Sequence, residues 1–192
     1  IICDHSIMAA KKSNTSTLFQ IPEDLKKGKI YPIYFLYGND SYGIDITIKA
    51  IEKGVEPFVT NEFDKETIYG SDIKEPEDII RIATSFPFGS EKKLLIVKEF
   101  EKIKEKKRLV SYIDNPAEFT ILVLIHNGNI SNVNTQPFKI LSDKNYSYEA
   151  KELKEDALSD WLSSYAREKG KSLSEENALH FVNTVGLNRS LI

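Results

Sequence analysis

Two glycines in a loop after an apolar run have the spacing that best fits binding chemistry. Residues 31–45 read YPIYFLYGNDSYGID, and Gly38 and Gly43 match the G-x-x-x-x-G outline of a phosphate-binding loop. Such a loop needs a lysine for the phosphates and a hydroxyl for Mg²⁺, but the chain has Ile44 and Asp45 there. We therefore predict the shape of a nucleotide site without its binding groups. The alternative interpretation is an ordinary strand-to-helix turn.

A second candidate site is an aromatic segment around one proline. Residues 85–90 read SFPFGS, so Phe86 and Phe88 flank Pro87. Either phenylalanine can fold back into the core. Alternatively, a bulky apolar side chain on a rigid helix end can fill a pocket on a partner, because it loses little entropy on docking. The segment is thus a candidate protein-binding site.

The sequence contains no motif that is typical of a catalytic site. No G-x-S-x-G, C-x-x-C or H-E-x-x-H pattern occurs. His126 and Asn127 follow an apolar run where a nucleotide hydrolase is expected to place its carboxylates. His126 is a candidate general base by position, but without an adjacent carboxylate in the sequence we favour a structural or solvent-facing role.

Composition excludes several classes of protein. The 192 residues are 41% hydrophobic with a formal net charge of −3, which fits a globular chain and argues against a surface that is basic throughout. One cysteine, Cys3, excludes an internal disulfide, and His5, His126 and His180 are too scattered for a metal site. Without a long apolar run or a signal-peptide pattern, we expect a cytoplasmic protein with no membrane association.

Alternating strand-like and helix-like segments predict an α/β fold with a parallel five-stranded sheet and flanking helices. The expected strands are 33–37, 66–69, 94–97, 119–125 and 146–150. The runs at 94–97 and 119–125 are continuously apolar, which is typical of strands buried on both faces.

Helical spacing predicts the layers around this sheet. A stripe of Ile44, Ile48, Ile51 and Val55 predicts the first helix, capped by Asp40 or Ser41. A second helix is expected to begin at Pro76 and to stop by Pro87. A charged helix is expected next, over Ile103, Leu109, Val110 and Ile113 and ended by Asn115 and Pro116. Its many lysines form a solvated face, with a weak phosphate-facing role as the alternative.

The ends of the chain differ from this pattern. We expect residues 1–28 to be a poorly structured extension, with Met8 as the natural start and 1–7 as an upstream addition. Residues 29–152 form the expected sheet domain. From 153 to 192 we expect the start of a helical domain, with one helix stopped by Gly170 and another capped by Ser174. A third helix is expected to start at Asn188, so the chain is interpreted as a fragment.

Together these segments resemble the delta subunit family of bacterial DNA polymerase III, a clamp-loader subunit. The resemblance is carried by YFLYGNDSYGID, SFPFGSEKKLLIVKEFEKI, NPAEFTILVLI and the stretch from EAKELKEDALSDW to NTVGLN, in this order. It covers roughly residues 29–192. It implies a degenerate AAA+ (P-loop-like) domain that has lost nucleotide binding, followed by a small all-α lid domain and then a helical collar domain that this chain lacks.

The resemblance also implies a function without catalysis or cofactors. Members bind the ring-shaped sliding clamp and help to open it for loading onto primed DNA, within a polymerase holoenzyme. The implied partners are the clamp and, in a hetero-pentamer, ATP-binding motor subunits and a delta-prime-like subunit. Primer-template DNA is implied as a partner of the assembled complex only.

By position, the anchoring phenylalanine of the family falls on Phe88 and its leucine partner on Pro87. Because this chain departs from the Leu-Phe pair, Phe86 is the alternative second contact. Phe86, Pro87 and Phe88 are therefore the expected clamp-binding residues, and Gly38 and Gly43 mark a loop not expected to bind nucleotide. Two other functions stay open: a nucleotide-binding NTPase with a variant loop, and a non-catalytic scaffold with unrelated partners.

Overall fold

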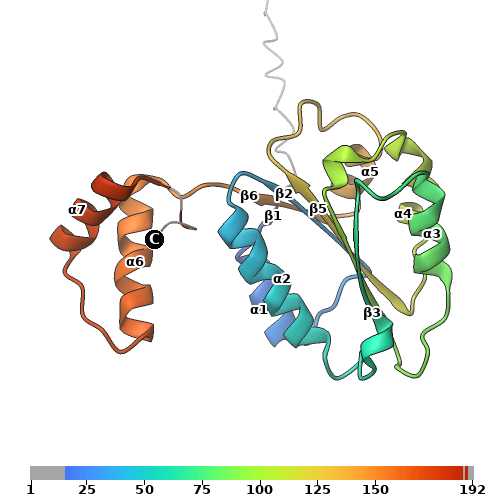
Figure 1. Ribbon diagram of the computed structural model, residues 1–192, viewed down its shortest axis with the longest axis horizontal. Helices are drawn as coiled ribbons and strands as arrows, with labels where there is room; N and C mark the ends of the chain where they lie inside the picture. The colour runs from blue at the N-terminus through green and yellow to red at the C-terminus, as the bar shows by residue number, and fades with distance from the viewer. Residues whose placement is uncertain (1–15, 188, 190–192) are drawn as a thin grey trace, which may run out of the picture.

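The chain folds into a parallel sheet covered by helices on both faces, with a pair of helices to one side (Figure 1). The computed structural model describes residues 16–187 and 189. The strands are β1 (Ser16–Thr17), β2 (Ile33–Gly38), β3 (Lys65–Tyr69), β4 (Lys93–Lys98), β5 (Thr120–Asn127) and β6 (Ser147–Ala150).

Seven α-helices and three short 3-10 helices lie in the described part of the chain. The α-helices are α1 (Gln20–Lys26), α2 (Ser41–Val55), α3 (Pro76–Thr84), α4 (Val110–Asp114), α5 (Phe138–Asp143), α6 (Glu155–Glu168) and α7 (Glu175–Val185). The 3-10 helices are η1 (Glu62–Asp64), η2 (Phe100–Lys102) and η3 (Lys106–Leu109).

The sheet has the strand order β1-β6-β2-β5-β4-β3, and every pair is parallel. The predicted parallel five-stranded sheet with flanking helices is confirmed, and β1 adds a two-residue strand beside β6. All six residues of β2 are buried, because helices cover both faces of the sheet. The carboxyl ends of β2, β4 and β5 therefore share one edge of the sheet.

Alternating side chains of the strands feed two separate cores. Tyr34 and Leu36 pack with residues of α1 and α2, whereas Ile33, Phe35 and Tyr37 pack with residues of α3, α4 and α5. This alternation follows from the two-residue period of a strand. It fixes α2 on one face of the sheet and α3 on the other.

Two predicted features, an apolar stripe and an N-cap, fix the start of α2. Its apolar stripe is buried against the sheet: Ile44, Ile48, Ile51 and Val55. Asp40 is the N-cap, because its side chain accepts a hydrogen bond from the Gly43 N–H at 3.0 Å. The loop before α2 is therefore held directly at the end of β2.

Two expectations differ from the structure. Part of the extension expected to be poorly structured contains β1 and α1, because Leu18 and Ile21 are buried in the core; residues 1–15 lie outside the described part. The charged helix expected around Ile103 is broken into η2, η3 and the short α4. The break is made by left-handed backbone at Glu99 and Glu105, with φ of 56° and 47°.

Helices α6 and α7 pack on each other beside the sheet (Figure 1). Their shared core is small: Leu158, Leu162, Ala178 and Val182. As predicted, α6 ends just before Gly170, and Ser174 caps α7, accepting a hydrogen bond from the Asn177 N–H. The helix expected from Asn188 falls outside the described residues.

Candidate functional site

Asn39 and Asp40 join β2 to α2 at the carboxyl edge of the sheet, so the predicted glycine loop is a short connection, with Gly38 at the end of the strand and Gly43 in the first turn of the helix. Gly38 has φ of 134°, and a Cβ atom there would lie 2.2 Å from the carbonyl oxygen of Ala150. Only glycine therefore fits where β2 ends against β6. The first glycine is required by packing, whether or not a ligand binds.

Four backbone donors between Asp40 and Ile44 are already bound within the chain. The Gly43 N–H donates to the Asp40 carboxylate, and the Ile44 N–H donates to the Asp40 carbonyl at 3.0 Å. The Asp40 N–H donates to the Ala150 carbonyl at 3.2 Å, and the Ser41 N–H to the Asn39 carbonyl at 3.0 Å. A phosphate-binding loop uses such donors for its ligand. Here a carboxylate of the chain itself occupies the start of the helix.

Ile44 and Asp45, which stand where a phosphate-binding loop has its lysine and its hydroxyl, differ in burial. Ile44 is buried in the core under α2, and Asp45 is exposed. Neither supplies a cation at the loop. The structure thus brings the four predicted loop residues together at the start of α2, with Asp40 as an additional anion.

A buried arginine pairs with this anion. The Arg189 guanidinium contacts the Asp40 carboxylate through both Nε, at 3.2 Å, and Nη2. Its Cζ lies 5.2 Å from the ring centroids of both Tyr42 and Trp161. Both charged side chains are more than nine-tenths buried. Sequence reasoning missed Arg189, because no local pattern links it to a loop at the other end of the chain.

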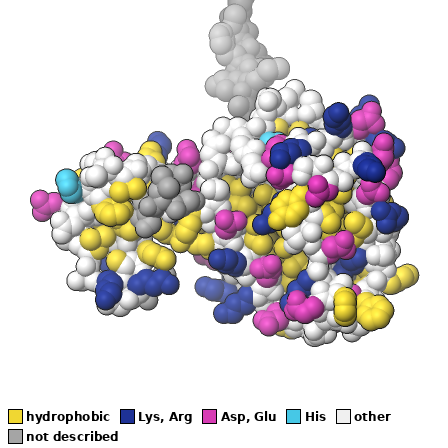
Figure 2. Space-filling model, viewed as in Figure 1, with side chains coloured by type: hydrophobic (Ala, Val, Ile, Leu, Met, Phe, Trp, Pro, Cys, Tyr) yellow, Lys and Arg dark blue, Asp and Glu magenta, His cyan; other side chains and the backbone are white. Residues whose placement is uncertain are grey.

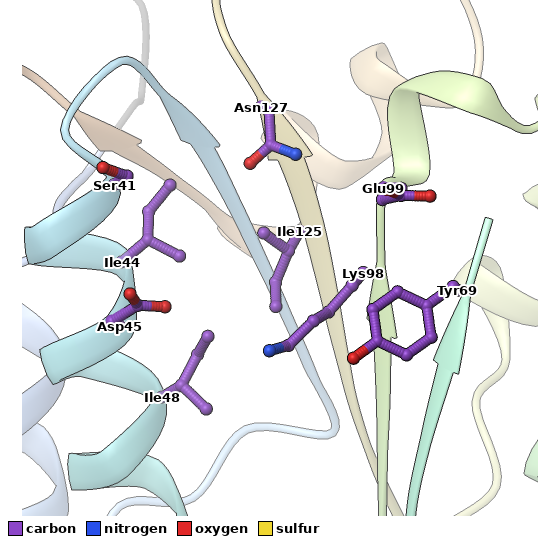
Figure 3. Close-up of a pocket in the computed structure, with 9 residues that line it drawn as sticks. All are labelled: Ser41, Ile44, Asp45, Ile48, Tyr69, Lys98, Glu99, Ile125 and Asn127. Carbon is purple, nitrogen blue, oxygen red and sulfur yellow. The ribbon is translucent and has the colours of Figure 1, made fainter. Parts of the chain in front are cut away.

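A pocket of about 260 Å³ lies between α2 and the ends of β4 and β5 (Figure 3). In Figure 3, Lys98 of β4 reaches toward α2, and the Glu99 side chain points away from Asp45. The Glu99 carboxylate forms an ion pair with Lys102 at 2.8 Å. The sequence pattern pointed to the residues after β2 and β5 as candidate site residues, but not to Lys98 and Glu99 at the end of β4. The pocket has one lysine but no cluster of carboxylates for a metal.

His126 packs within the sheet layer and not into an acid–base pair. Its ring lies edge-on to Phe35 and Phe138, with centroids 6.3 and 5.9 Å away. Burial lowers the pKa of His126 below its ordinary value, so the ring is neutral at pH 7. The neighbouring Asn127 is bound by Glu101 through its N–H and its amide. Of the structural and solvent-facing roles that we favoured, these contacts support the structural one.

Three exposed phenylalanines form the second candidate site, which we call the aromatic tip: Phe63, Phe86 and Phe88. Their exposed fractions are 82%, 82% and 78%. Figure 2 shows hydrophobic side chains standing out at the lower right of the sheet unit, where η1 and the loop after α3 lie in Figure 1. Neither Phe86 nor Phe88 folds back into the core, and Pro87 between them is partly buried. Exposed rings of this size are typical of a binding surface.

The rings of the tip contact one another and their surroundings. Phe63 of η1 lies edge-on to Phe88 with centroids 5.9 Å apart. Phe86 stacks on the partly buried Phe119 at 4.8 Å. Sequence reasoning missed Phe63, because it belongs to another element. An isolated phenylalanine in a polar segment gave no signal.

Buried polar groups hold the loop that carries Phe86 and Phe88. The Lys93 ammonium donates to the Ile82 carbonyl at 2.6 Å and to the Ser85 hydroxyl at 2.8 Å. This places a cation at the carboxyl end of α3, where the helix dipole favours it. The Asp64 carboxylate accepts hydrogen bonds from the N–H groups of Phe88 and Ser90. The aromatic tip is therefore fixed to the sheet.

Acid is expected to loosen this loop. Burial alone would raise the pKa of Asp64, but the hydrogen bonds from Phe88 and Ser90 lower it below 3.8. The Asp64 carboxylate therefore contributes stability above its ordinary pKa, and this contribution is lost as the pH falls through the lowered value. Asp64→Asn should reduce the free energy of unfolding by about 1–3 kcal/mol at pH 7, with a smaller loss at acid pH.

Urea unfolding at several pH values measures this effect. Glu62→Gln, which changes the exposed carboxylate on the same 3-10 helix, is the matched control and should leave stability nearly unchanged. An Asp64→Asn variant with the same pH dependence of stability as the parent chain would contradict the assignment.

Two features of the described residues bear on other functions. Within 16–187 and 189, no group of three or more His, Cys, Asp or Glu side chains is placed to hold a metal ion. In the same part of the chain, no helix combines the length and apolar character needed to cross a membrane.

Comparison with known proteins identifies similar chains. Residues 34–151 match the family model described as DNA polymerase III, delta subunit. The DNA polymerase III subunit delta of Bacillus subtilis is 32% identical over 177 residues, covering 86% of this chain and 50% of that protein. The structure of the Bacillus subtilis DNA clamp loader delta protein (YqeN) matches with a TM-score of 0.71 and 29% identity, covering 91% and 54% of the two chains.

More distant structures share the fold alone. The Thermotoga maritima RuvB Holliday junction branch migration motor matches at a TM-score of 0.56 and 15% identity, covering 91% of this chain and 56% of that chain. Cdc6p from Pyrobaculum aerophilum matches at 0.52 and 15%, covering 97% and 60%. These neighbours confirm the predicted AAA+-like fold. The chain spans about half the length of the Bacillus subtilis delta protein.

Proposed function

This chain belongs to the DNA polymerase III delta subunit family, and on that premise we propose that it binds the sliding clamp through the aromatic tip. The observation that carries the proposal is the exposure of Phe86 and Phe88 on a loop that buried groups hold in place. A rigid apolar side chain loses little conformational entropy when it enters a pocket. The tip is thus suited to dock without rearranging.

Binding of this kind supplies free energy for opening the clamp. One well-buried aromatic anchor contributes about 2–4 kcal/mol to an interface. If the pocket on the clamp is better formed when an interface between clamp subunits is strained or open, part of this binding free energy shifts the clamp toward the open state. The chain would then assist loading onto primed DNA without hydrolysing a nucleotide itself.

We further propose that this chain works beside subunits that bind ATP. In this proposal it joins motor subunits and a delta-prime-like subunit in a hetero-pentamer, and it meets primer-template DNA only in that assembly. Residues 29–152 would be the clamp-binding domain, with β1 and α1 packed against it, and 153–192 the start of the lid domain. A titration against the sliding clamp from the same genome tests the proposal: saturable binding is expected, and no binding would favour the scaffold alternative.

ATP is expected not to stabilise the chain. The loop has Ile44 in place of a lysine, four of its N–H groups are bound internally, and the Asp40 carboxylate occupies the helix start. A ligand at 100 times its dissociation constant would add about 2.7 kcal/mol of stability. Thermal unfolding with ATP and Mg²⁺ should therefore give the same midpoint as without them. A clear rise in the midpoint would favour the nucleotide-binding alternative.

A further inference from the structure

Phe63 and Phe88 form a two-ring unit built from separate segments. Phe63 lies on η1, before β3, and Phe88 lies in the loop between α3 and β4. Their rings meet edge-on at 5.9 Å, within the range of favourable aromatic pairs. Both side chains stay about four-fifths exposed despite this contact. The pair therefore presents one continuous apolar surface.

The backbone of both phenylalanines is held at the same short helix, η1. The Phe63 N–H donates to the Asn61 side chain at 3.0 Å, which holds the start of η1. The next residue, Asp64, accepts a hydrogen bond from the Phe88 N–H. A shift of η1 would thus move both rings together. Phe86 differs, because its ring stacks on Phe119 instead.

We propose that Phe63 is a further clamp-contacting residue, which enters the same apolar pocket of the clamp as Phe88. This inference rests on the proposed function, because it takes Phe88 as a clamp contact. A pocket that encloses the Phe88 ring meets the adjoining Phe63 ring as well. The pocket must therefore be wide enough for two edge-to-face rings, and Phe63 is its second anchor in preference to Phe86.

The test is the affinity of the chain for the sliding clamp of the same genome. We expect Phe63→Ala to weaken binding about tenfold, and Phe86→Ala to have a smaller effect. Because the rings share one pocket, the Phe63→Ala/Phe88→Ala double variant should lose less affinity than the two single losses combined. Phe19→Ala is the matched control, since Phe19 is 63% exposed and lies outside the tip.

Hydrogen–deuterium exchange of the Phe88 N–H in the free Phe63→Ala variant separates contact from positioning. Exchange as slow as in the parent chain, together with weakened binding, supports direct contact. Faster exchange with weakened binding means that Phe63 acts only through the loop, and overturns the inference. An unchanged affinity for Phe63→Ala, with Phe88→Ala still impaired, also overturns it but leaves the proposed function standing. If Phe88→Ala binds as tightly as the parent chain, the proposed function itself fails.

Discussion

Replacing Phe88 with alanine should weaken binding to the sliding clamp by about 30-fold to 700-fold. This range corresponds to about 2–4 kcal/mol, the usual loss when a central aromatic anchor is truncated. The reason is geometric: Phe88 is 78% exposed, on a loop whose N–H groups are bound by Asp64. Truncation removes the contact that Phe88 buries in the complex with the clamp. The free energy of unfolding should change little, because the ring is exposed in the free chain.

Isothermal titration calorimetry or surface plasmon resonance measures the clamp affinity of the parent chain and of the Phe88→Ala variant. Phe19→Ala controls for the loss of an exposed phenylalanine, because Phe19 lines a different pocket, beside α6. Its affinity should match that of the parent chain. Equal weakening by both substitutions would show a non-specific apolar effect, and no weakening by Phe88→Ala would remove the tip from the interface.

Replacing Asp40 with alanine should reduce the free energy of unfolding by about 3–5 kcal/mol. The substitution leaves the buried Arg189 guanidinium without its partner, and breaking a buried pair typically costs this much. It also removes the N-cap of α2. We further expect α6 and α7 to exchange amide hydrogens faster, because Arg189 contacts Trp161 of α6 as well as Asp40.

Urea unfolding and hydrogen exchange measure these two effects. Ser174→Ala is the matched control, because it removes only the N-cap of α7 and should cost about 1 kcal/mol. If Asp40→Ala cost no more than Ser174→Ala, the Arg189 contact would contribute nothing to stability. Unchanged exchange in α6 would show that the helices are held by other contacts.

The elements of the fold were predictable because their signals are local. The strand runs, the Ile44 to Val55 stripe, the stop near Gly170 and the cap at Ser174 all follow from neighbouring residues. The broken charged segment was not predictable in this way. Its residues have helical spacing, but the backbone is left-handed at Glu99, directly after β4, and at Glu105, directly before η3.

The sites depend more on contacts between distant residues. The sequence indicated the missing loop lysine and marked Phe86 and Phe88 as candidate contacts, because residue types alone carry those signals, but it left open whether the two rings pack in the core. It did not indicate that Arg189 meets Asp40, that Phe63 meets Phe88 or that Asp64 holds the loop after α3. Each of these contacts joins segments that only the folded sheet brings together.

Clamp affinity measured with and without ATP and Mg²⁺ tests the central claim most directly. The claim is that the aromatic tip binds the clamp while the loop before α2 holds an internal carboxylate in place of a nucleotide. We predict saturable binding with the same dissociation constant under both conditions, and binding that is weakened about 30-fold to 700-fold in Phe88→Ala. Binding that requires ATP, or that is unaffected by Phe88→Ala, would contradict it.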